Sequence, residues 1–165
     1  GLYAPARLLC ALLLLAIPSI GSAQPRAAPA PAAPAPLPVP DSSTLAKLLW
    51  STMSAVDQAN KTGNYSVLRD LGSAGFQQAN DAGRLAAAFA GIRQQRLDLS
   101  DTLLFEPWYE FPPGFQGPLL RLRGGFRMRP TAAEFDLLYR WDNGWRIEAI
   151  AVRAVPMGQT QPAGR

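Results

Sequence analysis

The sequence predicts an α+β domain over residues 41–157, with three helices followed by an antiparallel sheet. Three observations support this fold class. Apolar residues recur at helical spacing in the first half of the segment, and the period changes to two from Leu99 onward. Asn143-Gly144 then marks a tight hairpin between the last two apolar runs. Because the helical and strand patterns are separated along the chain, the sequence favours α+β over α/β.

Three helices are expected before the strands. The first begins at an N-cap among residues 41–43 and ends near Gly63. Its apolar face is formed by Leu45, Leu48, Leu49, Thr52, Met53 and Val56. The second is short, over residues 65–71, and the third is capped by Asn80 or Asp81. The apolar face of the third helix is formed by Leu85, Phe89 and Ile92.

Four strands are expected in the second half. They cover residues 102–111, 119–129, 132–141 and 145–154. A two-residue loop at Asn143-Gly144 pairs residues whose numbers sum to 287. One face then carries the pairs Phe135/Val152, Leu137/Ile150, Tyr139/Glu148 and Trp141/Arg146. The other carries Glu134/Arg153, Asp136/Ala151, Leu138/Ala149 and Arg140/Ile147. A longer turn would shift these pairs.

The order of these elements resembles the nuclear transport factor 2-like (cystatin-like cone) superfamily. So do the stretches TGNYSVLRDLGSAGF (62–76) and FDLLYRWDNGWRIEAIAV (135–152), which are similar to those of small secreted bacterial members. The resemblance covers residues 44–154. It implies three N-terminal helices packed on a strongly curved antiparallel sheet, a pocket, and frequent dimerisation through the sheet. The superfamily contains a ketosteroid isomerase, dehydratases and polyketide cyclases as well as modules that only bind, so the resemblance does not choose a reaction.

The N-terminal segment, residues 1–23, indicates a secretory signal peptide. Arg7 supplies a positive flank, residues 8–20 are almost wholly apolar, and small residues follow up to Ala23. The apolar run is shorter than the roughly 20 residues that a spanning helix needs. We therefore expect cleavage after Ala23, a periplasmic or secreted protein, and no stable membrane span once the signal is removed.

Two further segments are expected to lie outside the fold. Residues 24–40 are rich in Pro and Ala and predict a semi-rigid linker, while residues 158–165 predict a disordered tail. The whole chain carries 16 Lys plus Arg and 12 Asp plus Glu, a net charge of +4. Without the three arginines outside residues 41–157, that domain carries 13 basic and 12 acidic residues, a net charge of +1. Bulk basic character is thus absent, and no nucleic-acid partner is expected.

The composition excludes several kinds of site. The chain has no His and one Cys, Cys10, which lies in the expected signal peptide. This rules out a Ser-His-Asp triad, a Cys-His dyad and a His or multi-Cys metal site within the chain. We expect neither a metal nor a cofactor, so any chemistry must come from carboxylates, Tyr and Arg.

A first group of candidate site residues lies at one end of the predicted hairpin. The expected ligand-binding residues are Tyr139, Trp141, Arg146 and Glu148, joined by Met53 and Phe89 from the helices. Glu148 or Asp136 could serve as a general base, and Tyr139 could donate to an oxyanion. The favoured alternative is that Glu148 pairs with Arg146 or Arg140 at the sheet rim and Arg146 stacks on Trp141.

A second group is an arginine comb on one strand. Its members are Arg121, Arg123, Arg127 and Arg129, which share a face if no bulge intervenes. They could form an anion-binding surface. The favoured alternative is a solvated face on which they pair with Glu106, Glu110, Glu134 and Asp136. The Gly124-Gly125 pair within Arg123-Gly124-Gly125-Phe126 predicts a β-bulge rather than an RNA-binding repeat.

The leading functional hypothesis is an exported, non-catalytic binding module. It would hold a small apolar or amphipathic ligand in a pocket, or form a homodimer or another protein interface through its sheet. One alternative is a cofactor-independent lyase or isomerase that uses a pocket carboxylate. Another is a basic surface that docks anionic envelope polymers.

Overall fold

The computed structural model of the chain describes residues 28–30 and 35–158. Contacts divide the chain between Pro36 and Leu37, and every helix and strand of the described residues lies in the second unit. The expected signal peptide, 1–23, and tail residues 159–165 lie outside the described residues, as do parts of the expected linker. Within the described part, no helix is long and apolar enough to cross a membrane.

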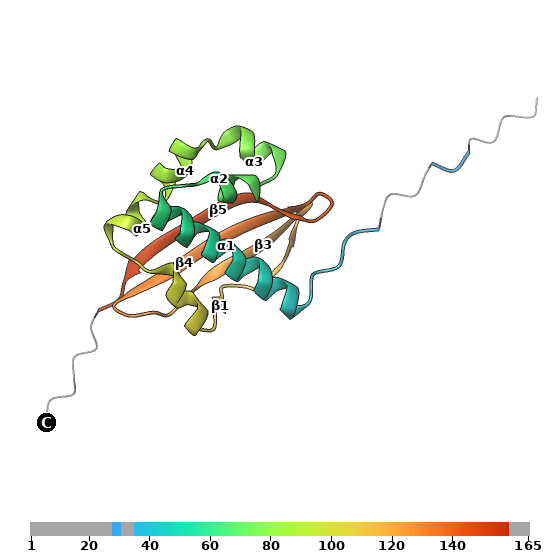
Figure 1. Cartoon of the computed structure of the whole chain (residues 1–165). Helices are drawn as coiled ribbons and strands as arrows, with labels where there is room; N and C mark the ends of the chain where they lie inside the picture. Colours follow the sequence, from blue (N-terminus) through green and yellow to red (C-terminus); the bar gives the residue numbers. More distant parts are fainter. Residues whose placement is uncertain (1–27, 31–34, 159–165) are drawn as a thin grey trace, which may run out of the picture. The chain divides into compact units, whose positions relative to one another are not determined.

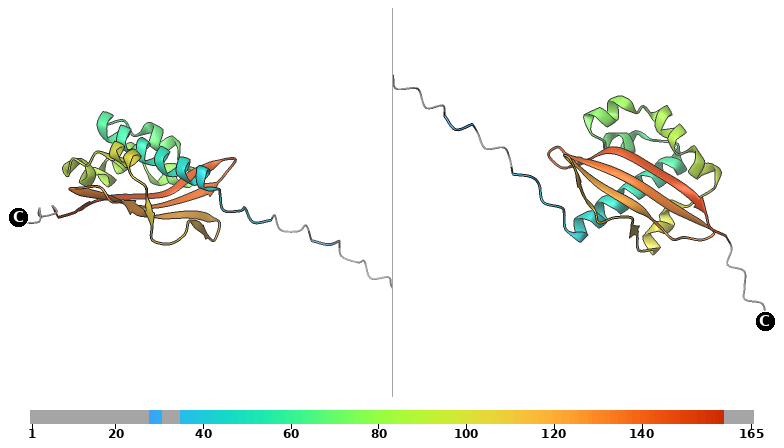
Figure 2. Two further views of the ribbon diagram at one scale, coloured as in Figure 1. Left: turned by 90° about the horizontal axis from the view of Figure 1, so that it is seen from below. Right: turned by 180° about the vertical axis from the view of Figure 1, so that it is seen from behind.

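The unit is α+β, with a curved antiparallel sheet that does not close (Figures 1 and 2). Its strands are β1 (Trp108–Tyr109), β2 (Gly114–Gln116), β3 (Leu119–Phe126), β4 (Thr131–Trp141) and β5 (Trp145–Pro156). The order across the sheet is β1-β3-β4-β5, and β2 also pairs with β3. The helices cover one face, called here the inner face, and leave the outer face bare (Figure 2).

The helices follow the expected signals closely at the start of the domain. Helix α1 (Ser42–Thr62) begins after Asp41, whose carboxylate accepts from the Thr44 N–H, and ends at Gly63 with φ of 73°. The shorter helices are α2 (Ser66–Asp70), α3 (Ala74–Ala79), α4 (Ala82–Ala88) and α5 (Ala90–Gln94). The segment between the expected second and third helices thus contains a further helix, α3. The expected third helix is divided into α4 and α5 near Phe89.

The prediction of one continuous strand over residues 102–111 is wrong. In its place lie the 3₁₀ helix η1 (Leu99–Leu104) and the two residues of β1. Asp98 accepts bonds from both the backbone N–H and the hydroxyl of Ser100, and Thr102 donates its hydroxyl to the Leu99 carbonyl. These local side-chain bonds favour a helical turn over a sheet ladder. The three-residue period of η1 buries Leu99 and Thr102.

The core lies between α1 and the inner face of the sheet. Its fully buried residues include Leu49, Met53 and Val56 from α1 and Leu120, Leu122, Leu137 and Tyr139 from the strands. The Tyr139 hydroxyl lies 2.6 Å from the Thr52 Oγ1 and donates to the Leu48 carbonyl oxygen at 3.1 Å. The polar atoms carried into this core by Thr52 and Tyr139 thus satisfy each other.

The predicted β4–β5 register is correct over the first part of the hairpin and wrong near the turn. Pairs from Glu134/Arg153 to Leu138/Ala149 are observed. A bulge then intervenes at Glu148, so that Tyr139 pairs with Ile147. The loop has three residues, because Trp141 pairs with Trp145. Because Glu148 is an extra, unpaired residue in β5, every later residue of β4 pairs one position further along β5 than predicted.

The bulge expected at the Gly124-Gly125 pair does not occur, because β3 runs in unbroken register against β4 from Leu119 to Phe126. The glycines serve a close approach instead. A Cβ on Gly124 would lie 1.9 Å from the Trp108 carbonyl oxygen, and one on Gly125 would lie 3.0 Å from the Trp108 indole nitrogen. The pair therefore lets β1 lie directly against β3, with the indole over Gly125.

Candidate functional site

The residues expected to line a pocket do not converge. Met53, Phe89 and Tyr139 are 1–2% exposed and belong to the core between the helices and the sheet. Trp141, at the hairpin end, is 48% exposed and packs edge-on against Trp145, with ring centroids 5.2 Å apart. Arg146 pairs in register with Arg140 rather than with Trp141. The bulge is the physical reason for this last difference.

Glu148 lies at the sheet rim and is held by two partners. Its carboxylate accepts from Arg140 at 3.1 and 3.2 Å and from the Ser73 hydroxyl at 2.5 Å. Arg140 and then Ser73 lower the pKa of the Glu148 carboxyl from its usual 4.5. The group is thus a stable carboxylate near neutral pH, which favours the rim-pairing alternative over a role as a base.

Tyr139 is held in its neutral form. Burial raises the pKa of its hydroxyl well above the usual 10.0, and this effect outweighs the lowering by the bond to Thr52. Its hydrogen bonds go to Thr52 and to the Leu48 carbonyl oxygen, both within the core. Asp136, the other candidate base, lies on the outer face of β4, opposite Arg123 in the register and beside Arg121. The three catalytic candidates are therefore distributed over the core, the rim and the outer face.

The first two arginines of the comb are paired on the outer face. Arg121 binds Asp136 through two bonds of 2.8 and 2.6 Å, and Arg123 lies 2.7 Å from Glu110. Glu134, a possible partner of the comb, pairs with Arg153 on the neighbouring strand β5, which is also its partner in the predicted register. A depression of about 740 Å³ is lined partly by these paired charges and partly by residues of the helical side, including Ala88 and Phe89. Pairing in this form leaves little net charge to attract a polyanion.

The other two arginines lie beyond the end of β3. The Arg127 guanidinium stacks over the Trp108 ring at 5.9 Å, and Arg129 donates to the Gly158 carbonyl oxygen at 2.7 Å. The strand ends at Phe126, so the four arginines do not form one row. The alignment that defined the comb in the sequence therefore holds for its first two members.

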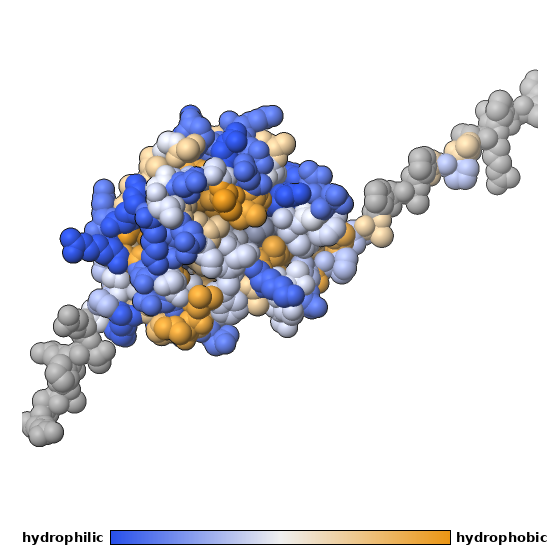
Figure 3. Space-filling model, viewed as in Figure 1, coloured by the Kyte–Doolittle hydropathy of each residue, from blue (hydrophilic) through white to orange (hydrophobic). Residues whose placement is uncertain are grey.

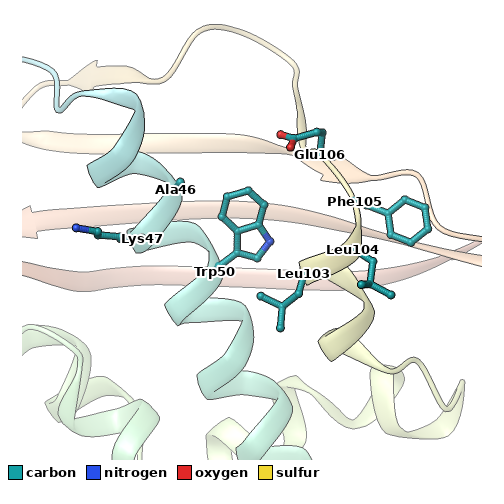
Figure 4. Close-up of a pocket in the computed structure, with 7 residues that line it drawn as sticks. All are labelled: Ala46, Lys47, Trp50, Leu103, Leu104, Phe105 and Glu106. Carbon is teal, nitrogen blue, oxygen red and sulfur yellow. The ribbon is translucent and has the colours of Figure 1, made fainter.

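The structure instead exposes an apolar groove between α1 and η1 (Figure 4). This Trp50 groove is lined by Ala46, Lys47, Trp50, Leu103, Leu104, Phe105 and Glu106. It has a volume of about 460 Å³. Leu103, Leu104 and Phe105 are 61, 79 and 40% exposed, and Figure 3 shows hydrophobic surface at η1. Three consecutive exposed apolar residues are unusual on a folded surface without a binding role.

Trp50 is fixed in this groove. Its indole N–H donates to the Thr102 carbonyl oxygen at 3.0 Å, and its ring packs against the buried Phe126 at a centroid distance of 6.3 Å. The indole is half-buried, with its remaining surface directed into the groove (Figure 4). An aromatic side chain held in one orientation costs little entropy to bury further, which suits it as an anchor for a partner.

Each wall of the groove also carries one charge. Lys47 comes from α1 and extends its ammonium away from Trp50, while Glu106 follows η1, and both are exposed (Figure 4). Neither takes part in an ion pair within the described residues. The nearby Asp41 carboxylate caps α1 by accepting from Thr44, whose hydrogen bond is the main cause of its lowered pKa, and the charge of Lys47 adds to that lowering. The groove therefore combines an apolar floor with two unpaired charges of opposite sign.

The groove was not predicted from the sequence, because residues 102–111 were expected to form a strand. A strand would place Leu103 and Leu104 on opposite faces of the sheet, whereas η1 exposes both. The run Leu103-Leu104-Phe105, which does not alternate with polar residues, was the available signal. A second shallow groove, of about 500 Å³, lies between α1 and α2 and includes the 64% exposed Val67.

Comparison of the chain with family models, curated proteins and solved structures found no match.

Proposed function

We propose that this chain is an exported, non-catalytic binding module that recognises an apolar or amphipathic partner through the Trp50 groove. One observation carries the proposal: Leu103, Leu104 and Phe105 are exposed in sequence beside an indole that is fixed by its bond to Thr102. Burying such side chains removes apolar surface from water, and this supplies the binding free energy. The carboxylates expected to act as bases are held by arginines, which supports binding rather than catalysis.

We further propose that the domain is a member of the nuclear transport factor 2-like superfamily with the cone-shaped form of its fold. The support is the long α1 lying across one face of a curved antiparallel sheet, with the other helices on the same face (Figure 1). In this chain Tyr139, Met53 and Phe89 fill the space beneath α1. Ligand recognition is accordingly assigned to the rim of the helical layer.

Binding of the fluorescent dye 1-anilinonaphthalene-8-sulfonate to the full chain tests the proposal. The dye has an apolar ring system and one charge, as an amphipathic partner would. We expect saturable fluorescence enhancement, and about tenfold weaker binding to a Leu104→Asp variant because a carboxylate replaces an apolar contact. Leu104 is 79% exposed, so this change does not disturb the core.

Val67→Asp is the matched control, since Val67 is 64% exposed in the other groove. Its dye affinity should equal that of the unchanged chain. Equal weakening by both substitutions, or dye binding that neither alters, would refute the Trp50 groove as the contact surface.

A further inference from the structure

We infer that the partner seated in the Trp50 groove is a second copy of this chain, related by a two-fold axis. The inference rests on the proposed function and names the partner of the same site. A two-fold interface needs a patch that complements itself, such that residue i contacts residue j of the other copy and the reverse. Both the shape and the charge of the Trp50 groove meet this condition.

The shape provides a ridge beside a groove. Leu103 points from η1 toward α1, Leu104 points to the other side of η1, and the Trp50 groove lies between α1 and η1 (Figure 4). A two-fold rotation about an axis through the patch places α1 of one copy against η1 of the other. Each Leu104 then enters the groove of the opposite copy, next to its Trp50. Every exposed apolar residue of the run gains an apolar neighbour, as in the buried centre of a protein interface.

The charges are distributed in the same self-complementary way. Lys47 lies on the α1 side of the groove and Glu106 on the η1 side. The same rotation therefore brings Lys47 of each copy to Glu106 of the other, which makes two equivalent contacts. Each charge lacks an ion-pair partner within its own described residues. An amphiphile with one charge can satisfy only one of these two residues, whereas a second copy satisfies both. The net charge of +1 over residues 41–157 gives little general repulsion between copies.

The outer face of the sheet lacks these properties. Its charged side chains are paired within one copy, Arg121 with Asp136, Arg123 with Glu110 and Arg153 with Glu134. Joining two such faces would bury satisfied ion pairs, whose desolvation opposes association. The observations therefore favour the helical rim over the sheet as the site of self-association.

Charge reversal tests the inference. Native mass spectrometry and sedimentation velocity of the full chain should show a monomer–dimer equilibrium in the range up to about 100 μM. Lys47→Glu and Glu106→Lys should each weaken homodimer formation by about tenfold or more, because each places two pairs of like charges across the interface. The double variant K47E/E106K should restore the dimer.

The decisive arm mixes the two single variants, distinguished by mass. In the mixed dimer both contacts join opposite charges, so heterodimers should form at concentrations where each variant alone is monomeric. Val67→Asp is the matched control and should leave dimerisation unchanged.

Each other outcome contradicts the inference. A chain that stays monomeric but binds the dye through Leu104 would overturn the second copy as partner and leave the proposed function standing. A dimer that ignores Lys47, Glu106 and Leu104 but is lost with Ala151→Arg, on the exposed outer face of β5, would assign self-association to the sheet. If the chain neither forms a dimer nor binds the dye in a way that depends on Leu104, both proposals are refuted.

Discussion

The outer face of the sheet and the Trp50 groove are two surfaces of one domain that treat charge and apolar area in opposite ways. On the outer face, Arg121 donates two hydrogen bonds to Asp136, and the neighbouring arginines have carboxylates of their own. In the groove, apolar side chains are exposed beside charges without ion-pair partners in the described part of the chain. In this sequence a row of like charges is therefore a weaker guide to function than a short apolar run that does not alternate with polar residues.

The physical reason is the location of possible partners. Cross-strand neighbours lie close together on a sheet, so opposite charges on adjacent strands satisfy each other. Residues of η1 have α1 on one side and solvent on the other. Leu103 and Leu104 therefore cannot be covered by the chain's own strands, and a partner can remove their surface from water.

Breaking the sheet at its closest backbone approach, between β1 and β3, should have the largest effect. Gly124→Ala would place a Cβ 1.9 Å from the Trp108 carbonyl oxygen. We expect β1 to leave β3, with a loss of about 3 kcal/mol in the free energy of unfolding. Gly91→Ala is the control, because nothing lies within 4 Å of that position. Urea unfolding measures both, and equal stability of the two variants would contradict the close approach.

Removing the buried hydroxyl should have a smaller effect with a distinct pH dependence. Tyr139→Phe deprives Thr52 of a partner, and we expect a loss of about 1 to 2 kcal/mol. Burial raises the pKa of Tyr139, so its contribution is complete below pH 10.0, the unfolded value, and is lost as the pH rises above it. Thermal unfolding between neutral and alkaline pH should therefore show a steeper decline for the unchanged chain. Parallel declines would contradict a buried, neutral Tyr139.

The rim carboxylate should show the opposite pH dependence. Glu148→Gln removes the ion pair with Arg140 and weakens the bond from Ser73, at a cost of about 1 kcal/mol near neutral pH. The pKa of Glu148 is lowered, so its contribution is present above pH 4.5 and is lost as the pH falls through the folded value. The two chains should thus converge in stability in acid. A constant difference down to low pH would contradict the pairing.

The smallest stability effect belongs to the groove itself. Leu104→Asp changes a residue that is 79% exposed, so we expect the free energy of unfolding of the monomer to change by no more than about 0.5 kcal/mol. Chemical denaturation at low concentration measures this. A large loss would show that Leu104 supports the fold, and the contrast between the two surfaces would then fail.

Elements governed by neighbouring residues could be predicted from the sequence. Helix α1 begins after Asp41 and ends at Gly63 because both caps act within one turn. The hairpin register is correct from Glu134 to Leu138, where alternation alone decides which side chains are buried. The charge pairing of Arg121 and Arg123 also follows from strand adjacency.

Features that depend on distant contacts could not be predicted. The bulge at Glu148 is accompanied by a bond from Ser73, 75 positions earlier in the chain, and no local pattern marks it. The division between η1 and β1 depends on side-chain bonds of Asp98 and Thr102 competing with alternation in the following residues. The groove is a consequence of that competition, and so it appears only when η1 is placed against α1.

Hydroxyl-radical footprinting of the full chain at low and high concentration tests the central claim most directly, because it reports both surfaces at once. The account predicts that Leu103, Leu104 and Phe105 become protected as the concentration rises, while Leu138 on the outer face and Val67 in the other groove keep their labelling. Unchanged labelling of the Leu103–Phe105 run, or protection of Leu138 in its place, would contradict it.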